Sequence, residues 1–194
     1  MANEKKLRVE AAIKGSVVLE FVNAIRGRIG AERYERLVRT LHDEDRKLFL
    51  GVIDPGGWYS LDACVHILEA DLQANDGGIE SVLVERSEAV FDKQLRGIYR
   101  LFVKFGSPEF LMKRIGLVHM TYFNGILLES VSQAPGRAVF RYTGFEPKHH
   151  LIGCAIVGFY KKALEMSGAT GVRVVFATPI REGKGYAELV ASWA

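Results

Sequence analysis

The residue pattern changes character after Gly116, and this change most constrains the fold. Before it, apolar residues recur at helical spacing, as in the segment 16–30, where Val17, Phe21 and Ile25 share one face. After it, short β-branched and aromatic runs alternate with turns, which is typical of strands. The sequence therefore predicts a helical N-terminal half followed by a half that forms a sheet.

Periodicity and helix start and stop signals define the predicted helices of the first half. Ser107, Pro108 and Glu109 form a strong helix start, because a cap, a proline at the first position and an acid follow one another. Before this start, helices are predicted over residues 16–30, 32–41, 61–75 and 87–105.

The second half predicts four strands around one long helix. The runs "MTYFNGILLESV" (120–131) and "RAVFRYTGF" (137–145) flank a turn and form a predicted hairpin. A helix over 147–168 follows, and then the predicted strands 172–180 and 185–193. No linker or repeat interrupts residues 1–194, so we expect a single α+β domain. Its helical N-terminal half packs on a four-stranded antiparallel sheet with the order strand–strand–helix–strand–strand.

Composition excludes several classes of protein. Hydrophobic residues make up 48% and charged residues 25%, which is ordinary for a chain with a core. The net charge is +3, and lysines and arginines are mixed with acids, which argues against a nucleic-acid surface. Cys64 and Cys154 lie in apolar stretches and are expected to be buried, reduced thiols. No apolar leader and no run of membrane-spanning length occurs, so we expect a cytoplasmic protein.

Three stretches carry a resemblance to known proteins: "KGSVVLEFVNAIRGRIG", "GRAVFRYTGFEPKHHLIGCAIVGFYKKAL" and "GYAELVASW". They resemble the superfamily that haem–nitric-oxide-binding domains share with four-vinyl-reductase-type ligand domains and TRAPP vesicle-tethering subunits. The stretch "DPGGWYSLDACVHILEA" is similar to an uncharacterised family of paralogues abundant in myxobacteria. The resemblance implies a bacterial protein with the haem-NO-binding or TRAPP-like α+β scaffold, and relatives with this scaffold often pair as homodimers.

The resemblance also implies where a haem would bind. In the haem-binding members a helical histidine ligates iron, and a Tyr-x-Ser-x-Arg motif holds the propionates. The matching residues here are Tyr142, Gly144 and Glu146, and Glu146 would repel a carboxylate where arginine would pair with it. His119 follows Gly116, where we expect helix to give way to strand. We therefore expect His119 to be a core-edge histidine with a hydrogen-bond partner, and we expect no haem or other cofactor.

Other residues that could carry chemistry also have plainer structural roles. His150 and Cys154 are one helical turn apart and, with His149, suggest a metal site. Zinc takes four ligands, or three and a water, and no further ligand stands at metal-type spacing. We expect the two histidines to lie at the surface of a helix start and to bind no metal. Cys64 lies on an apolar helix face, so packing is favoured over nucleophilic catalysis.

These observations favour a non-enzymatic binding or signalling module that engages a protein partner and a small apolar ligand. His119, Tyr122, Phe102 and Tyr142 are the predicted lining of a pocket between helices and sheet, although aromatics at such spacing are more often core. The alternatives are a sensor of a tetrapyrrole or a lipid, and an enzyme of unknown reaction.

The first predicted helix also suggests a homodimer through the helical half. Its apolar residues surround more of the helix than one face requires, so it must be buried on more than one side. A second copy of the chain or another helix of the same chain would cover it equally well. These residues are Val17, Val18, Leu19, Phe21, Val22, Ala24 and Ile25.

Overall fold

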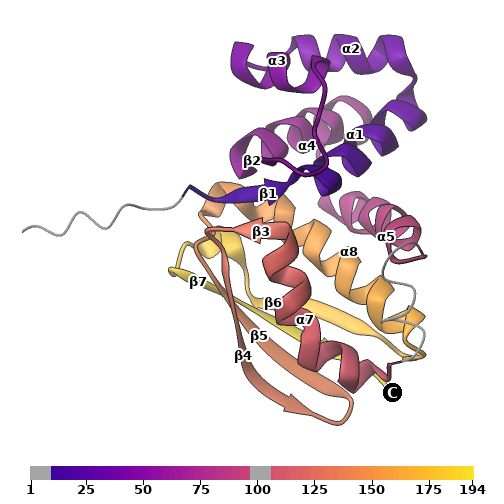
Figure 1. Cartoon of the computed structure of the whole chain (residues 1–194), viewed down its shortest axis with the longest axis vertical. Helices are drawn as coiled ribbons and strands as arrows, with labels where there is room; N and C mark the ends of the chain where they lie inside the picture. Colours follow the sequence, from indigo (N-terminus) through magenta and orange to yellow (C-terminus); the bar gives the residue numbers. More distant parts are fainter. Residues whose placement is uncertain (1–9, 97–105) are drawn as a thin grey trace, which may run out of the picture.

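The computed structural model describes residues 10–96 and 106–194, with a group of helices at one end and a sheet with two helices at the other (Figure 1). Helix α5 runs between these two parts and lies beside α8. The buried apolar residues of both parts form one contiguous core. No helix among the described residues is long and apolar enough to cross a membrane.

The helical part contains one helix that its sequence did not reveal. Helix α3 carries three acids in its first turn, Asp43, Glu44 and Asp45, which favour a helix N-terminus. Helix α5 begins at Glu80, ahead of the predicted start at residue 87, and the last nine residues of that predicted helix lie outside the described residues. The helices of this part are α1 (Gly15–Ile29), α2 (Ala31–Arg39), α3 (Asp43–Leu50), α4 (Leu61–Asp76) and α5 (Glu80–Arg96).

A small three-stranded sheet, also unpredicted, joins the chain's distant parts. Strand β1 (Ala12–Lys14) pairs antiparallel with β2 (Trp58–Ser60) on one side and β3 (Phe123–Asn124) on the other. The strands are only two or three residues long, so no periodic pattern marks them in the sequence. They hold the start of α1 against the end of α7.

The predicted four-stranded antiparallel sheet is confirmed, with the order β4-β5-β7-β6. The hairpin β4-β5 pairs in the register Leu128 with Tyr142 and Ser130 with Phe140. The 3-10 turn η2 (Ile180–Glu182) connects the last two strands. The strands are β4 (Leu127–Ala134), β5 (Arg137–Thr143), β6 (Arg173–Thr178) and β7 (Tyr186–Ser192).

Two helices, α7 (Pro108–Tyr122) and α8 (His150–Met166), pack on the face of the sheet that carries Phe140 and Tyr142 (Figure 1). A 3-10 turn, η1 (Pro147–His149), leads into α8. The predicted start of α7 is confirmed, because the Ser107 hydroxyl accepts a hydrogen bond from the Phe110 N–H at 3.3 Å.

The predicted change from helix to strand after Gly116 is wrong. Helix α7 continues to Tyr122, and the hairpin's first strand begins at Leu127 rather than at residue 120. Gly116 lies in the helix without disrupting it, and Ile115 before it and Val118 and Tyr122 beyond it keep the helical spacing. Tertiary packing of these residues outweighs the strand propensity of the segment.

Helices α5 and α8 cross at very close range, and a glycine makes this possible. A Cβ atom on Gly158 would lie 2.7 Å from the Ser87 Cβ and 2.7 Å from the Val84 carbonyl oxygen. The Ser87 hydroxyl is buried and donates to the Leu83 carbonyl at 2.7 Å. Ion pairs from α8 to α5 flank the crossing, including Lys162 with Asp92 at 2.9 Å.

The same chain covers the apolar circumference of α1. Phe21 and Val22 are buried, and the Phe21 ring meets the Phe91 ring of α5 edge-on at 6.1 Å. Ala24 is exposed. Intrachain packing, one of the two explanations left open by the sequence, therefore accounts for the pattern, and a homodimer stays a prediction that rests on the resemblance.

We predict that Gly158→Ala destabilises the protein by about 1–3 kcal/mol in urea unfolding, because overpacking against the α5 backbone outweighs the gain in helix propensity. The matched control is Gly116→Ala in α7, where an added Cβ would meet nothing within 4 Å. The control should be neutral or stabilising by up to about 1 kcal/mol. Equal effects of the two substitutions would contradict the role assigned to Gly158.

Candidate functional site

An apolar hollow of about 60 Å³ lies where the helical part meets the sheet. We call it the inner cavity. Its wall is almost entirely apolar and draws on both halves of the chain. Among the residues that line it are Val17, Phe21, Cys64, Leu68, Phe91, Ile115, Val118, Ile152, Ala155 and Ile156.

His119, Tyr122 and Tyr142, three of the four predicted lining residues, line the inner cavity. The fourth, Phe102, lies outside the described residues. Phe123, Phe159 and Tyr160 line it as well. Phe110, another aromatic of α7, faces solvent instead. A role for these residues in ligand binding stays a prediction.

His119 is held at the cavity wall by its neighbours. Its ring is 7% exposed, and Nε2 lies 2.8 Å from the Ile126 carbonyl oxygen. Because a carbonyl can only accept, Nε2 carries the hydrogen and donates it. The ring stacks on Phe123 at 4.9 Å and meets Tyr142 edge-on at 5.5 Å. Burial lowers the pKa of His119, which favours the neutral ring.

The other polar groups of the wall are also occupied or unreactive. The Tyr142 hydroxyl donates to the Tyr160 hydroxyl at 3.0 Å. Burial raises the pKa of both phenols, so neither ionises near neutral pH. Burial raises the pKa of the Cys64 thiol to about 12, and a thiol that stays protonated is a poor nucleophile. The wall therefore offers shape and apolar contact rather than acid–base or nucleophilic groups.

The residues at the positions of the haem-binding motif do not fit a haem. Gly144 has φ +103°, and a Cβ there would lie 2.4 Å from the Gly125 carbonyl oxygen, so a serine would force the backbone to move. Glu146 caps the turn η1. The inner cavity is far smaller than the roughly 300–1,000 Å³ of typical ligand pockets, and Nε2 of His119 is already bonded to Ile126.

His149 is not the surface residue predicted from its place at a helix start. It is 2% exposed and accepts a hydrogen bond at Nδ1 from the Glu146 N–H at 3.0 Å. Nε2 therefore carries the hydrogen and donates to Asp62 Oδ1 at 2.7 Å. Asp62 comes from α4, so this contact joins the helical part to the start of α8. His150 lies nearer the surface, 3.4 Å from Glu80. The described residues contain no cluster of ligands that would hold a metal.

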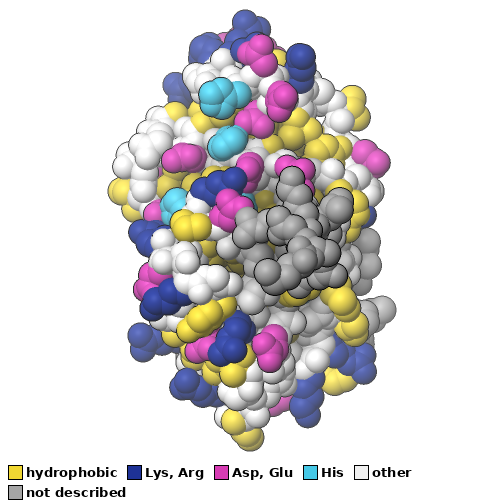
Figure 2. Space-filling view, turned by 90° about the vertical axis from the view of Figure 1, so that its left-hand side faces the viewer, with side chains coloured by type: hydrophobic (Ala, Val, Ile, Leu, Met, Phe, Trp, Pro, Cys, Tyr) yellow, Lys and Arg dark blue, Asp and Glu magenta, His cyan; other side chains and the backbone are white. Residues whose placement is uncertain are grey.

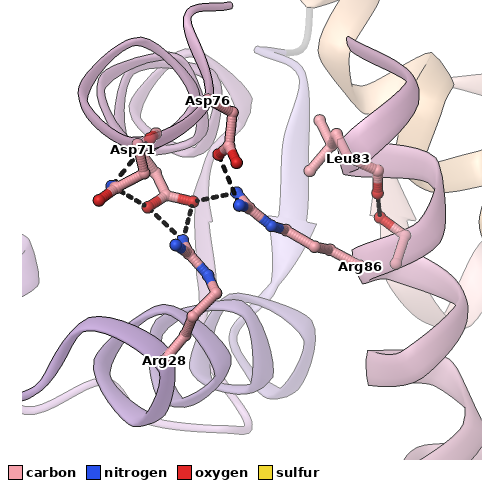
Figure 3. Close-up of polar contacts among 7 residues, drawn as sticks. Arg28, Asp71, Asp76, Leu83 and Arg86 are labelled. Atoms are coloured by element: carbon pink, nitrogen blue, oxygen red, sulfur yellow. Dashed lines mark hydrogen bonds and ion pairs between the residues drawn. The ribbon is translucent and has the colours of Figure 1, made fainter. Parts of the chain in front are cut away.

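A second hollow, the outer groove, has a volume of about 420 Å³ and runs between α1, α4 and α5. Figure 3 shows charged residues of its lining, where Asp71 of α4 forms ion pairs with Arg28 of α1 and Arg86 of α5. The Nη2 atom of Arg28 lies 2.5 Å from each Asp71 oxygen, and Nη1 of Arg86 lies 3.0 Å from Oδ2. Nη2 of Arg86 also lies 2.5 Å from Asp76.

The cluster of Arg28, Asp71, Asp76 and Arg86 was not predicted from the sequence, although one signal of it is present there. Asp71 stands beside Leu72 and one turn after Leu68, on the otherwise apolar face of α4. It is only 2% exposed in the structure. A carboxylate on a buried face must find cationic or hydrogen-bonding partners, but the sequence does not say which of its many arginines provide them.

The charged surface shows no single dominant sign on the face drawn in Figure 2. Acidic and basic side chains are interspersed there, with histidines among them over the helical part. A nucleic-acid interface is instead expected to gather Lys and Arg in one patch. On the described part of this face the pattern agrees with the predicted absence of nucleic-acid binding, which stays a prediction for the whole molecule.

Comparisons with known proteins identify the architecture. No family model matches the chain, and no curated protein matches its sequence. Among solved structures, an H-NOX protein from K. algicida in the Fe(II) unliganded state is 14% identical with a TM-score of 0.73, covering 93% of this chain and 96% of that chain. An H-NOX protein from S. oneidensis in the Fe(II)NO state is 15% identical with a TM-score of 0.71, covering 93% and 99%.

A third neighbour is an oxygen-binding H-NOX domain related to soluble guanylate cyclases, at 12% identity and a TM-score of 0.66, covering 93% of this chain and 94% of that chain. The chain has an H-NOX-like fold. This agrees with the haem–nitric-oxide-binding scaffold that the resemblance implies. The narrower likeness to a myxobacterial family stays a prediction.

We predict that acid destabilises the protein partly through His119. Burial lowers its pKa below the ordinary value of 6.5, so the unfolded state binds more protons as the pH falls through that value. Stability is therefore lost on the acid side. In urea unfolding at pH 7 and pH 5, His119→Gln should lose less stability than the wild type. Equal losses in the wild type and in His119→Gln would refute this.

We also predict that the purified protein is colourless and that added hemin gives no sharp Soret band at one-to-one stoichiometry. The reasons are the volume of the inner cavity, the backbone at Gly144 and the carboxylate of Glu146. Absorption spectra recorded during a hemin titration test this. A stoichiometric Soret band that disappears in His119→Ala would show that the prediction is wrong.

Proposed function

We propose that the protein is a non-enzymatic binding and signalling module that holds a small apolar ligand in the inner cavity and engages a protein partner. The observation that carries this proposal is the cavity wall, which is built from apolar side chains of both halves of the chain. The polar tips of His119, Tyr142 and Tyr160 already bond to other groups of the protein. A ligand without polar groups therefore leaves no hydrogen bond unmade.

The volume of the inner cavity supports a ligand of few atoms. About 60 Å³ exceeds the roughly 10–15 Å³ that a single water needs, but it is smaller than the roughly 150 Å³ of an apolar cavity known to bind benzene or xenon. The H-NOX structures with a similar fold include one in the NO-ligated Fe(II) state and one described as an oxygen complex. Those ligands are small as well, which agrees with a small-ligand module on this scaffold.

Helix α7 supports the signalling part of the proposal because it has two distinct faces. Ile115, Val118 and His119 contact the inner cavity. On its other side, the side chains of Leu117 and Met120 are 61% and 64% exposed. A ligand in the cavity would thus touch the same helix that offers apolar side chains to a partner. The partner, a homodimer and the cytoplasmic location stay predictions.

The alternatives have unequal support. The geometry around Gly144 and Glu146 does not support a tetrapyrrole sensor. The Cys64 thiol and the Tyr142 and Tyr160 phenols of the inner cavity are held protonated, so they do not support an enzyme. A lipid sensor is favoured by one observation, the outer groove that adjoins the inner cavity.

We predict that xenon enters the inner cavity. In methyl NMR spectra recorded under xenon pressure, the methyl groups of Ile115 and Ile152 should shift in a saturable way. Ala155→Val, which adds volume to the wall, should abolish these shifts. The matched control is Ala70→Val, at a partly buried position of α4 outside the wall. Shifts that are absent in the wild type, or that persist in a folded Ala155→Val protein, would count against the proposal.

A further inference from the structure

The inner cavity and the outer groove share part of their walls. Phe21 of α1 and Leu68 of α4 line both hollows. The Phe21 ring meets the Phe91 ring edge-on at 6.1 Å, and Phe91 lines only the inner cavity. The two hollows are therefore neighbours, and the side chains of Phe21 and Leu68 border both of them.

The two hollows differ in size in a way that bears on the ligand. The outer groove, at about 420 Å³, falls within the roughly 300–1,000 Å³ of typical ligand pockets, whereas the inner cavity does not. Small exposed residues, Ala24 and Gly27 on α1 and Ala89 on α5, face the groove and leave it open. An added Cβ on Gly27 would meet nothing within 4 Å.

The outer groove has both apolar and polar lining. Ile25, Leu68 and Leu83 supply apolar surface, and Leu68 also lines the inner cavity. Its polar lining, which we call the polar end, contains Arg28 and Arg86, paired with Asp71 (Figure 3). An elongated molecule with one polar and one apolar end matches this distribution.

The polar end has hydrogen-bond donors beyond those that the aspartates use. A guanidinium has five N–H donors, and among the described residues the bonds from Arg28 to Asp71 both come from Nη2. The positive charges of Arg28 and Arg86 are balanced by Asp71 and Asp76, so the groove does not demand an anion. What it offers is N–H donors for an oxygen acceptor.

We propose that the outer groove and the inner cavity together form a binding site for a single-chain amphiphile. Its oxygen-bearing head lies at Arg28 and Arg86, and its alkyl chain passes Phe21 into the inner cavity. This inference rests on the proposed binding function: the few apolar atoms that the inner cavity accommodates are the end of the alkyl chain, and the rest of the molecule lies in the outer groove. The head is a hydroxyl or a carboxylate, since both accept hydrogen bonds from guanidinium groups.

The test uses decanol and decanoate as probes with the full chain, and binding is followed by calorimetry and native mass spectrometry. We expect one-to-one binding of at least one probe, and the tighter probe identifies the head group. Ala24→Trp, which fills the outer groove, should weaken binding at least tenfold. The matched control Ala31→Trp, at an exposed position of α2, should leave the affinity within twofold.

A second variant guards against misfolding of Ala24→Trp. Ala89→Leu fills the groove from α5 with a smaller side chain and should also weaken binding, while circular dichroism confirms that it is folded. Arg28→Lys, which keeps the charge facing Asp71 but removes the fork of donors, should weaken both probes several-fold. The proposal is wrong if neither probe binds, or if folded Ala24→Trp and Ala89→Leu bind as tightly as the wild type.

The xenon experiment tests the proposed binding function separately from the amphiphile site. If xenon enters the inner cavity but neither ten-carbon probe binds, only the amphiphile site is refuted. If neither xenon nor a probe binds, the proposed ligand-binding function fails as well.

Discussion

The crossing of α5 over α8 at Ser87 and Gly158 joins the helical part of the molecule to the part that contains the sheet. Because Gly158 has no side chain, the two helices meet backbone to backbone. This contact holds α5 against α8. The space left between α1 and α5 is then filled only in part, since Ala24 and Ala89 are too small to close it.

Asp71 links the three helices that border this groove. A buried carboxylate is costly unless it is paired, and here guanidinium groups from α1 and α5 both reach it. The arrangement links three helices through one residue: removing Arg86 would take away the ion pairs of α5 with α4, and removing Arg28 would take away the ion pair of α1 with α4. Lys161 and Lys162 tie the other side of α5 to α8 by ion pairs with Glu88 and Asp92. Ion pairs therefore hold helix α5 on both sides, and close packing against Gly158 holds it at its centre.

Local signals in the sequence predicted those parts of the fold that depend on neighbours in the chain. The hairpin β4-β5, the helix α8 and the cap at Ser107 follow from residue patterns within a few positions. The His149–Asp62 contact joins residues 87 positions apart, and Arg28 lies 43 positions from Asp71, so no local pattern reveals either pair. The predicted cavity residues on α7 and β5 line the inner cavity, but the groove depends on how α5 is placed, which periodicity does not determine.

The departure from the haem-binding motif is best understood as a different use of the same positions. Gly144 allows the chain to turn tightly past the Gly125 carbonyl after β5, with φ +103°. Glu146 and His149 then satisfy each other's backbone and side-chain groups as α8 begins. A serine and an arginine would have to displace both arrangements before they could hold a propionate. Gly144, Glu146 and His149 thus serve the turn into α8, and the donors that the proposed amphiphile would use are the guanidinium groups of Arg28 and Arg86, which line the outer groove.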